Sequence, residues 1–124
     1  MSPSTRIRES SLRAGLRIKR VILFGRHIPS LVCFYRDVLG LPLLTDESDD
    51  GWAEFDAGGC RLALHRGRPA KGAKVVFWSK SVARDRDRLV QRGAAMGPVR
   101  NLGRLHLCDG QDPEGNVFQL SNRP

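Results

Sequence analysis

Four residues in strand-like segments have side chains that could carry out chemistry. Glu54 and His65 lie in neighbouring alternating runs, and together they could serve as a general acid/base pair. His106 precedes Cys108 by two residues on the same strand face, where a histidine could activate a thiol. The simpler interpretation, which we favour, is that the cysteine belongs to the core and that the histidines line a wet pocket.

The number and spacing of the cysteines indicate the redox compartment of the protein. Cys33, Cys60 and Cys108 are far apart in the chain and form no Cys-x-x-Cys pair. Each of them lies among apolar residues. This pattern predicts reduced thiols in the core of a cytoplasmic protein.

The net charge of +8 is concentrated at the start of the chain. Residues 1–20 contain six of the 21 basic residues and one of the 13 acidic residues, so the remainder is nearly balanced. No aromatic residue interleaves with these bases, as stacking on single-stranded nucleic acid would require. We therefore expect a loosely ordered basic leader over residues 1–18, with a nucleic-acid-binding arm as the less favoured alternative. No apolar run approaches the roughly 18 residues of a membrane span.

The spacing of apolar residues predicts four strands and one helix in each half of the chain. In the first half, the helix covers residues 31–39 and the strands cover 20–24, 41–44, 52–56 and 60–65. In the second half, the helix covers 82–91 and the strands cover 74–79, 96–102, 104–109 and 116–121. The halves align at offsets of 54 residues at their first strands and 56 residues at their last, which indicates an internal duplication.

The duplication predicts the fold and the residue bounds of its two modules. We expect an α+β protein in which two tandem β-α-β-β-β modules form an open, eight-stranded, barrel-like sheet around a concave pocket. After the leader, the modules cover residues 19–66 and 73–122, and residues 67–72 link them within one structural domain.

The predicted pocket is lined by strand residues that face away from the helices. Apolar positions such as Val21 and Leu23 are assigned to the helix side, which leaves their alternating neighbours for the cavity. His106 is included although the sequence leaves the register of its strand open. The expected pocket residues are Arg20, Ile22, Phe24, Trp52, Glu54, Arg61, Ala63, His65, Lys74, Trp78, His106 and Gln119.

Three stretches resemble a known superfamily. They are the helix end at residues 34–41, the strand at 51–55 and the Asp-Pro-Glu-Gly-Asn turn at 112–116. Together with the duplicated module, they closely resemble the vicinal oxygen chelate superfamily, which includes glyoxalase I, the bleomycin resistance proteins and the extradiol dioxygenases. The resemblance covers residues 19–122 and implies the fold more strongly than the function, because this fold hosts several chemistries.

The resemblance also implies where a metal ion would be held. Metal-dependent members place His, Gln or Glu ligands at four strand positions, which match Arg20, Ala63, Lys74 and Gln119 here. Arg and Lys carry a positive charge, Ala has no ligand atom, and Gln offers only a neutral carbonyl. We therefore expect a member that has lost the metal ligands and has no cofactor. A displaced site built from His65, His106 and Gln119 is the alternative.

The expected function is metal-free binding of a small molecule. Arg20 and Lys74 would need neutralisation by an acidic side chain such as Glu54 or by an anionic ligand, and the sequence leaves both open. Trp52 and Trp78 offer flat surface for an aromatic ligand. The alternative is a metal-dependent lyase, isomerase or dioxygenase of the same superfamily that uses a displaced site. The family habit of pairing implies a homodimer, either side by side or swapped.

Overall fold

The computed structural model describes residues 18–69 and 74–124. The basic leader expected over residues 1–18 falls almost wholly outside the described residues, as does part of the linker expected at 67–72. Those two expectations therefore stay predictions. In the described part of the chain, no helix is long and apolar enough to cross a membrane.

The first half of the chain forms a four-stranded sheet with one helical segment. Its strands lie in the order β1-β4-β3-β2, and β1 and β4 run parallel. In chain order the elements are β1 (Arg20–Gly25), α2 (Ile28–Cys33), the π-helical turn η1 (Phe34–Val38), β2 (Leu43–Glu47), the 3₁₀ turn η2 (Ser48–Asp50), β3 (Trp52–Asp56) and β4 (Arg61–Arg66).

The helix of this half begins earlier than the sequence predicts. We expected a helix starting at residue 31, but the structure places the cap at His27, whose Nδ1 accepts a hydrogen bond from the Ser30 backbone N–H at 3.3 Å. Pro29 lies in the first turn, where its missing N–H has no intrahelical partner to lose.

The second half repeats this plan with one more strand. Its sheet has the order β5-β9-β8-β6, with β7 also paired to β8, and β5 and β9 run parallel. In chain order the elements are β5 (Lys74–Trp78), α3 (Val82–Gln91), β6 (Ala95–Met96), β7 (Arg100–Leu102), β8 (Leu105–Gln111) and β9 (Val117–Ser121).

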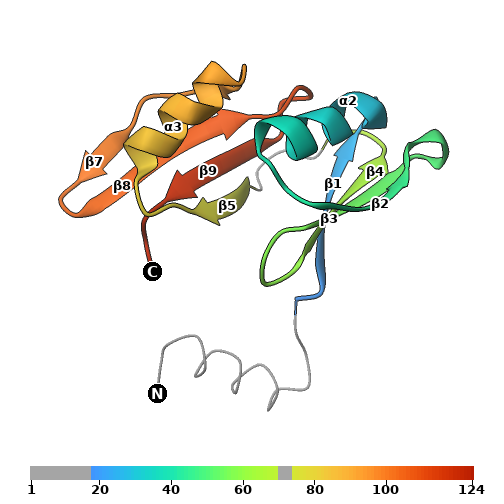
Figure 1. The fold of residues 1–124 in the computed structure, drawn as a ribbon, viewed down its shortest axis with the longest axis horizontal. Coiled ribbons are helices and arrows are strands. Elements are labelled where there is room, and N and C mark those ends of the chain that lie inside the picture. Colours follow the sequence, from blue (N-terminus) through green and yellow to red (C-terminus); the bar gives the residue numbers. More distant parts are fainter. Residues whose placement is uncertain (1–17, 70–73) are drawn as a thin grey trace, which may run out of the picture.

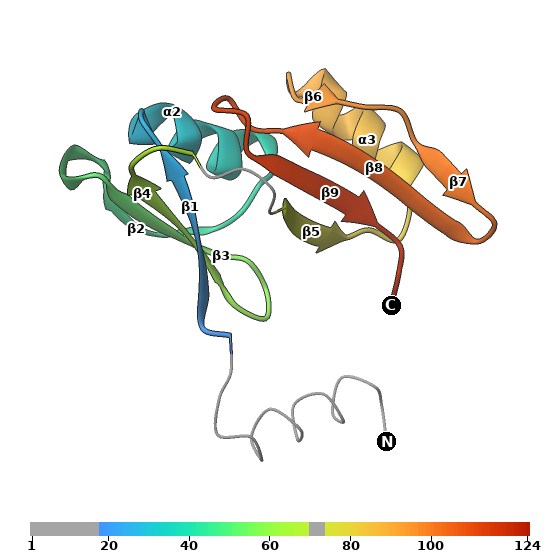
Figure 2. The same cartoon turned by 180° about the vertical axis from the view of Figure 1, so that it is seen from behind.

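The α+β class is confirmed, whereas the strand count differs from our expectation. The described residues form two sheets, of four and five strands, instead of the single eight-stranded sheet that we expected. The strand predicted at 96–102 is divided into β6 and β7 because Gly97 and Pro98 interrupt it, and proline cannot donate to the ladder. Figure 1 and Figure 2 show the two sheets side by side.

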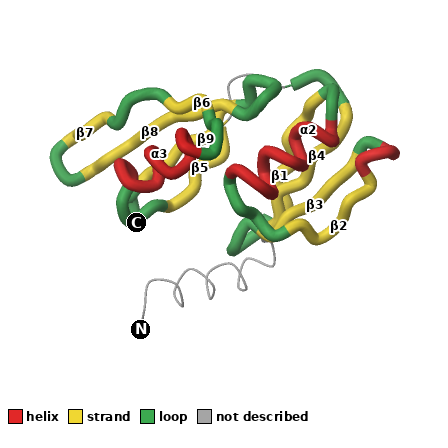
Figure 3. Tube along the Cα trace, turned by 45° about the horizontal axis from the view of Figure 1, so that its top comes forward, coloured by secondary structure: helices red, strands yellow, loops and turns green. Residues whose placement is uncertain are grey.

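The core lies between the sheets and the helices, which cover the same side of both sheets (Figure 3). Alternate residues of each strand point into it. The largest fully buried side chains are Tyr35, Phe55, Phe118, Ile28, Leu31, Leu62, Leu64, Val82 and Cys108. No helix among the described residues covers the opposite side of either sheet, which is called its open face below.

The turn between β8 and β9 joins the two halves on the helix side (Figure 1). The Asp112 carboxylate accepts hydrogen bonds from the backbone N–H groups of Glu114 and Asn116, both at 2.9 Å, while Gly115 takes the positive φ of 86° that the turn requires. The buried Tyr35 hydroxyl donates to the same carboxylate at 2.9 Å. The turn is thus ordered by a side chain that also contacts the first half.

Glu114 makes a second link across this boundary. Its carboxylate accepts hydrogen bonds from the backbone N–H groups of Arg26 and His27, the latter at 2.8 Å, just before α2. The first N–H groups of a helix have no intrahelical acceptors, so a carboxylate from elsewhere in the chain can satisfy them. Asn116 adds a third contact, from its side-chain amide to the Phe24 carbonyl at 3.2 Å.

Candidate functional site

The open face of the first sheet carries eight of the twelve residues that we expected in a pocket. The strand register arranges them, together with Asp56, in three rows across β1, β4 and β3. The rows are Phe24–His65–Trp52, Ile22–Ala63–Glu54 and Arg20–Arg61–Asp56. The face is therefore aromatic at one end and charged at the other.

Glu54 organises the charged end of this face. Its side chain is buried, and its carboxylate accepts hydrogen bonds from Arg20 Nε and, at 3.3 Å, from Arg61 Nη1. The internal salt bridge that we weighed as an alternative for Arg20 is thus what the structure shows. Two guanidinium groups share one carboxylate, and Asp56 in the outer row brings this end of the face to two bases and two acids. In the described part of the chain, Glu54 bonds to the two arginines and makes no hydrogen bond to His65, which lies in the next row.

The aromatic row places His65 between two larger rings. The ring centroids of Phe24 and His65 are 5.6 Å apart, and those of Trp52 and His65 are 5.5 Å apart in an edge-on arrangement. These separations lie in the range in which aromatic rings attract one another. The three rings form a continuous aromatic surface across the sheet.

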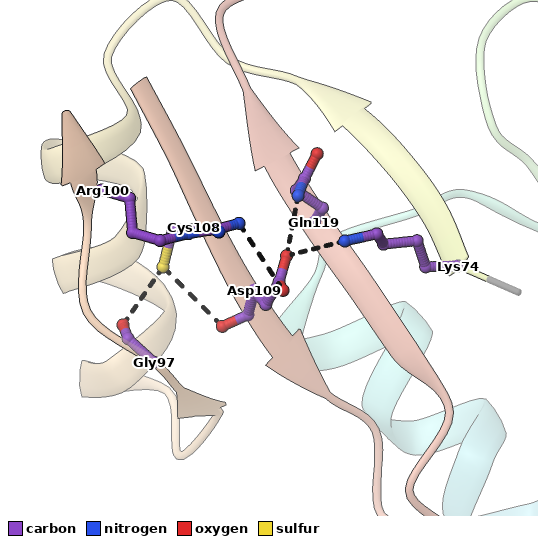
Figure 4. Close-up of polar contacts among 6 residues, drawn as sticks. All are labelled: Lys74, Gly97, Arg100, Cys108, Asp109 and Gln119. Carbon is purple, nitrogen blue, oxygen red and sulfur yellow. Dashed lines mark hydrogen bonds and ion pairs between the residues drawn. The ribbon is translucent and has the colours of Figure 1, made fainter. Parts of the chain in front are cut away.

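The open face of the second sheet has its own charged cluster, drawn in Figure 4. Gln119 Nε2 donates to Asp109 Oδ1 at 2.8 Å, and Lys74 Nζ lies 3.5 Å from the same oxygen. Arg100 Nη2 lies 3.9 Å from Asp109 Oδ2. The Asp109 carboxylate therefore contacts two cationic side chains and one side-chain amide.

Our sequence analysis missed Asp109. In the strand register, Asp109 lies opposite Gln119 as Glu54 lies opposite Ala63, so the two acids occupy equivalent places in the two sheets. Each accepts an ion pair from the first residue of its module's first strand, Arg20 or Lys74. Extending the internal alignment to the third strand of each module would have revealed this repeated pair.

His106 lies on the other face of β8 from Asp109 and shares that face with Cys108. We expected His106 in the pocket with Gln119, but the register separates them, and the displaced metal site that needed both residues is not assembled. Cys108 is buried, and its thiol lies 3.2 Å from the Gly97 carbonyl (Figure 4). Burial raises the pKa of the Cys108 thiol, which favours the protonated, unreactive form.

Two hollows border the expected site. One of about 490 Å³ lies on the open face of the second sheet and is lined by Val76, Leu107, Gln119, Ser121, Arg123 and Pro124. The other, of about 260 Å³, lies beside α3 and includes Trp78 and Leu39 in its lining. Within the described residues, each open face keeps its ion pairs inside its own sheet. That the twelve expected residues line one common pocket stays a prediction.

Comparison with known proteins identifies the family. The sequence model of the glyoxalase-like domain matches residues 21–121, so the chain belongs to this family. This confirms the resemblance to the vicinal oxygen chelate superfamily. The comparison with curated proteins found no match.

Solved structures share the fold at low sequence identity. Lactoylglutathione lyase from Agrobacterium tumefaciens has a TM-score of 0.72 and 18% identity, over 85% of this chain and 93% of that one. TnmS3, an antibiotic binding protein from Streptomyces sp. CB03234, has a TM-score of 0.73 and 22% identity, over 84% and 93%. TioX from Micromonospora sp. ML1 has a TM-score of 0.73 and 20% identity, over 87% and 99%.

The residues at the superfamily's metal positions do not fit a metal ion. Arg20 and Lys74 are cations held by Glu54 and Asp109, and Ala63 has no ligand atom. Gln119 directs its NH₂ group to Asp109. Among residues 18–69 and 74–124, no group of three or more His, Cys, Asp or Glu side chains is placed to hold a metal ion.

Proposed function

We propose that this glyoxalase-like protein binds a small molecule on its open sheet faces without using a metal ion. The observation that carries the proposal is the replacement of the metal ligands. Two of the four positions hold cations that are ion-paired within their own sheets, to Glu54 and to Asp109. An antibiotic binding protein of the same fold, TnmS3, supports a binding role for such an architecture.

The ligand that suits these faces is small and anionic or aromatic. Arg20 and Arg61 have more guanidinium N–H donors than the Glu54 carboxylate takes, and such donors suit an added anion. Trp52 and Phe24 supply flat apolar surface beside them.

We also propose that two copies associate to enclose the binding space in a barrel-like arrangement. The open faces carry apolar side chains that the described residues leave exposed: Ile22 is 41% exposed, Val76 53% and Trp78 65%. Covering such residues favours association. A cytoplasmic location agrees with the three free cysteines, Cys33, Cys60 and Cys108.

Metal analysis and a ligand screen test the proposed function together. Purified protein is assayed for bound divalent metals and then screened against small aromatic acids, neutral aromatics and aliphatic acids, before and after treatment with a chelator. The expected result is less than stoichiometric metal and ligand binding that the chelator leaves unchanged. A stoichiometric divalent metal, or turnover that the chelator abolishes, would overturn the proposal in favour of a lyase, isomerase or dioxygenase.

A further inference from the structure

We infer that the helix side of the molecule carries a separate binding site, for a small apolar carboxylate, in the hollow of about 260 Å³ beside α3. This hollow lies where the two halves of the chain meet and is called the seam hollow below. The apolar body of the ligand fills it, and the carboxylate binds Arg88 and Arg92 at its rim. The site lies apart from the open faces, so the inference goes beyond the proposed function and is independent of it.

The seam hollow is lined by both halves of the chain. Leu39 and Leu41 come from the segment between η1 and β2, whereas the other lining residues belong to β5, α3 and β9. Figure 3 shows the helical segment of the first half and α3 next to each other on the helix side. Arg92 Nη1 donates to the Val38 carbonyl at 3.1 Å across the same boundary. A ligand in the hollow therefore contacts both halves.

Most of the lining is apolar and suits a small ligand. Leu89 and Leu120 are buried and form the floor, at 7% and 6% exposure. The apolar lining residues that remain partly exposed are Leu39, Leu41, Phe77 and Trp78. Covering them favours an apolar occupant. At about 30 Å³ for each water the hollow has room for roughly nine waters, so the occupant has on the order of ten non-hydrogen atoms.

The rim of the seam hollow carries two guanidinium groups and one carboxylate. Asp85 Oδ2 accepts a hydrogen bond from the buried Ser79 hydroxyl at 2.5 Å, and Arg88 Nη1 lies 3.9 Å from Asp85 Oδ1. Arg92 donates to a neutral carbonyl, and no carboxylate among the described residues forms an ion pair with it. Because each guanidinium has five N–H donors, Arg88 and Arg92 keep donors for the two oxygens of a ligand carboxylate.

The surroundings of the rim are also positively charged. Residues 82–92 contain four arginines and two aspartates. On the facing segment of the first half, Arg36 and Asp37 pair with each other. The carbonyl end of α3 adds only about half a negative charge, which leaves the surplus positive. Arg88 and Arg92 are four residues apart on the helix, so their side chains are neighbours and can bind the same anion.

Matched probes test the inference. Binding of 2-naphthoate to the full-length protein is measured by calorimetry at physiological salt, beside 2-naphthamide, acetate and the larger 4-(1-pyrenyl)butyrate. 2-Naphthoate should bind about tenfold more tightly than the amide, because the anion gains charge-assisted hydrogen bonds. Acetate lacks the apolar body and the pyrenyl acid exceeds the space, so both should bind at least about tenfold more weakly than 2-naphthoate.

Substitutions assign the site to the seam hollow. Arg88→Gln and Arg92→Gln should each lower the affinity for 2-naphthoate by about five- to tenfold and leave that for the amide unchanged. Arg92→Lys should recover part of the loss. Arg84→Gln removes the same charge from α3 outside the lining, and should change the affinity by less than about twofold. Trp78→Ala should weaken acid and amide alike. Urea denaturation checks that each variant is folded, and Arg88→Gln leaves the Arg92–Val38 contact in place.

Four results would overturn the inference. Two of them are equal affinity for 2-naphthoate and 2-naphthamide, and an equal effect of Arg84→Gln and Arg92→Gln. The third is binding of 2-naphthoate that Lys74→Gln weakens and Arg88→Gln does not, which would move the ligand to the open face of the second sheet and support the proposed function instead. The fourth is no binding of 2-naphthoate at millimolar concentration, which would refute the seam hollow and leave the proposed function standing.

Discussion

Tyr35 is the only tyrosine in the chain, which makes its ionisation directly measurable. Its hydroxyl is buried and donates to Asp112. Burial raises the pKa of Tyr35 well above its ordinary value, and the negative charge of Asp112 raises it further. The folded-state pKa therefore lies above the unfolded-state value of about 10.

This shift predicts alkaline sensitivity. Below pH ~10 the stabilisation from the protonated Tyr35 is fully present, and it is lost as the pH rises toward the folded-state pKa. Tyrosinate absorbance should therefore stay absent from the folded protein above pH ~10 and appear only as it unfolds. Tyr35→Phe should lose the Asp112 contact but show a smaller fall in stability over the same alkaline range. Tyrosinate absorbance in the folded protein near pH ~10 would contradict the buried contact.

The two equivalent acids should differ in their effect on stability. Glu54 is buried and has two guanidinium partners, whereas the Asp109 side chain is 42% exposed. Glu54→Gln should lower the free energy of unfolding by about 1–2 kcal/mol, because the charge-assisted bonds are lost. Asp109→Asn should cost less than about 1 kcal/mol, as expected for exposed ion pairs. Urea denaturation measures both, and a larger cost for Asp109→Asn would refute the ranking.

At the scale of elements, the β8–β9 turn should matter more than its exposed position suggests. Asp112→Ala removes the acceptor of the buried Tyr35 hydroxyl and of the Glu114 and Asn116 N–H groups. We expect a loss of about 2–4 kcal/mol, since buried donors are left unsatisfied. Chemical denaturation followed by circular dichroism provides the measurement.

The matched control for this turn is Asp112→Asn. The amide oxygen can still accept one set of these hydrogen bonds, so the variant should retain part of the lost stability. Asp49→Ala, an exposed acid in η2, should change the free energy of unfolding by less than about 0.5 kcal/mol. An Asp112→Ala protein as stable as Asp49→Ala would show that the turn does not join the halves.

Secondary-structure elements whose bounds are marked by one clear sequence pattern were predictable from the sequence. The strand at Trp52–Asp56 and the helix at Val82–Gln91 have the predicted bounds, because alternation defines the first and Gly93 ends the second. Elements with competing signals were less predictable. Asp46 and Glu47 look like a loop by composition, yet they pair with β3 as part of the edge strand β2. Edge strands tolerate charge because one side faces solvent.

At the scale of the whole molecule, the internal repeat made the fold class predictable, but not the arrangement of the site. Alternation assigned Arg20, Glu54 and His65 to one face of a sheet, and the register agrees. It could not fix the register of β8, which places His106 on the other face, because that strand carries mixed polarity on both sides. Nor can spacing along a chain show that two faces belong to separate sheets.

The exposed apolar residues lead to a prediction about assembly. We expect the wild-type protein to sediment as a dimer at micromolar concentration. Val76→Asp should shift it toward monomer, because a charge would be buried between copies. Val90→Asp is the control, since Val90 is also exposed but lies on α3, on the helix side of its sheet. Analytical ultracentrifugation decides the matter, and a wild-type monomer at all concentrations would refute the dimer.

The links across the β8–β9 turn also bear on the order in which the molecule is made. The first sheet can close once Arg66 has been synthesised, because β1 pairs with β4. At that stage the Tyr35 hydroxyl and the N–H groups before α2 still lack Asp112 and Glu114. A nascent chain that has reached only Arg66 therefore lacks the acceptors of these hydrogen bonds. The last hairpin supplies their acceptors and completes the first half as well as the second.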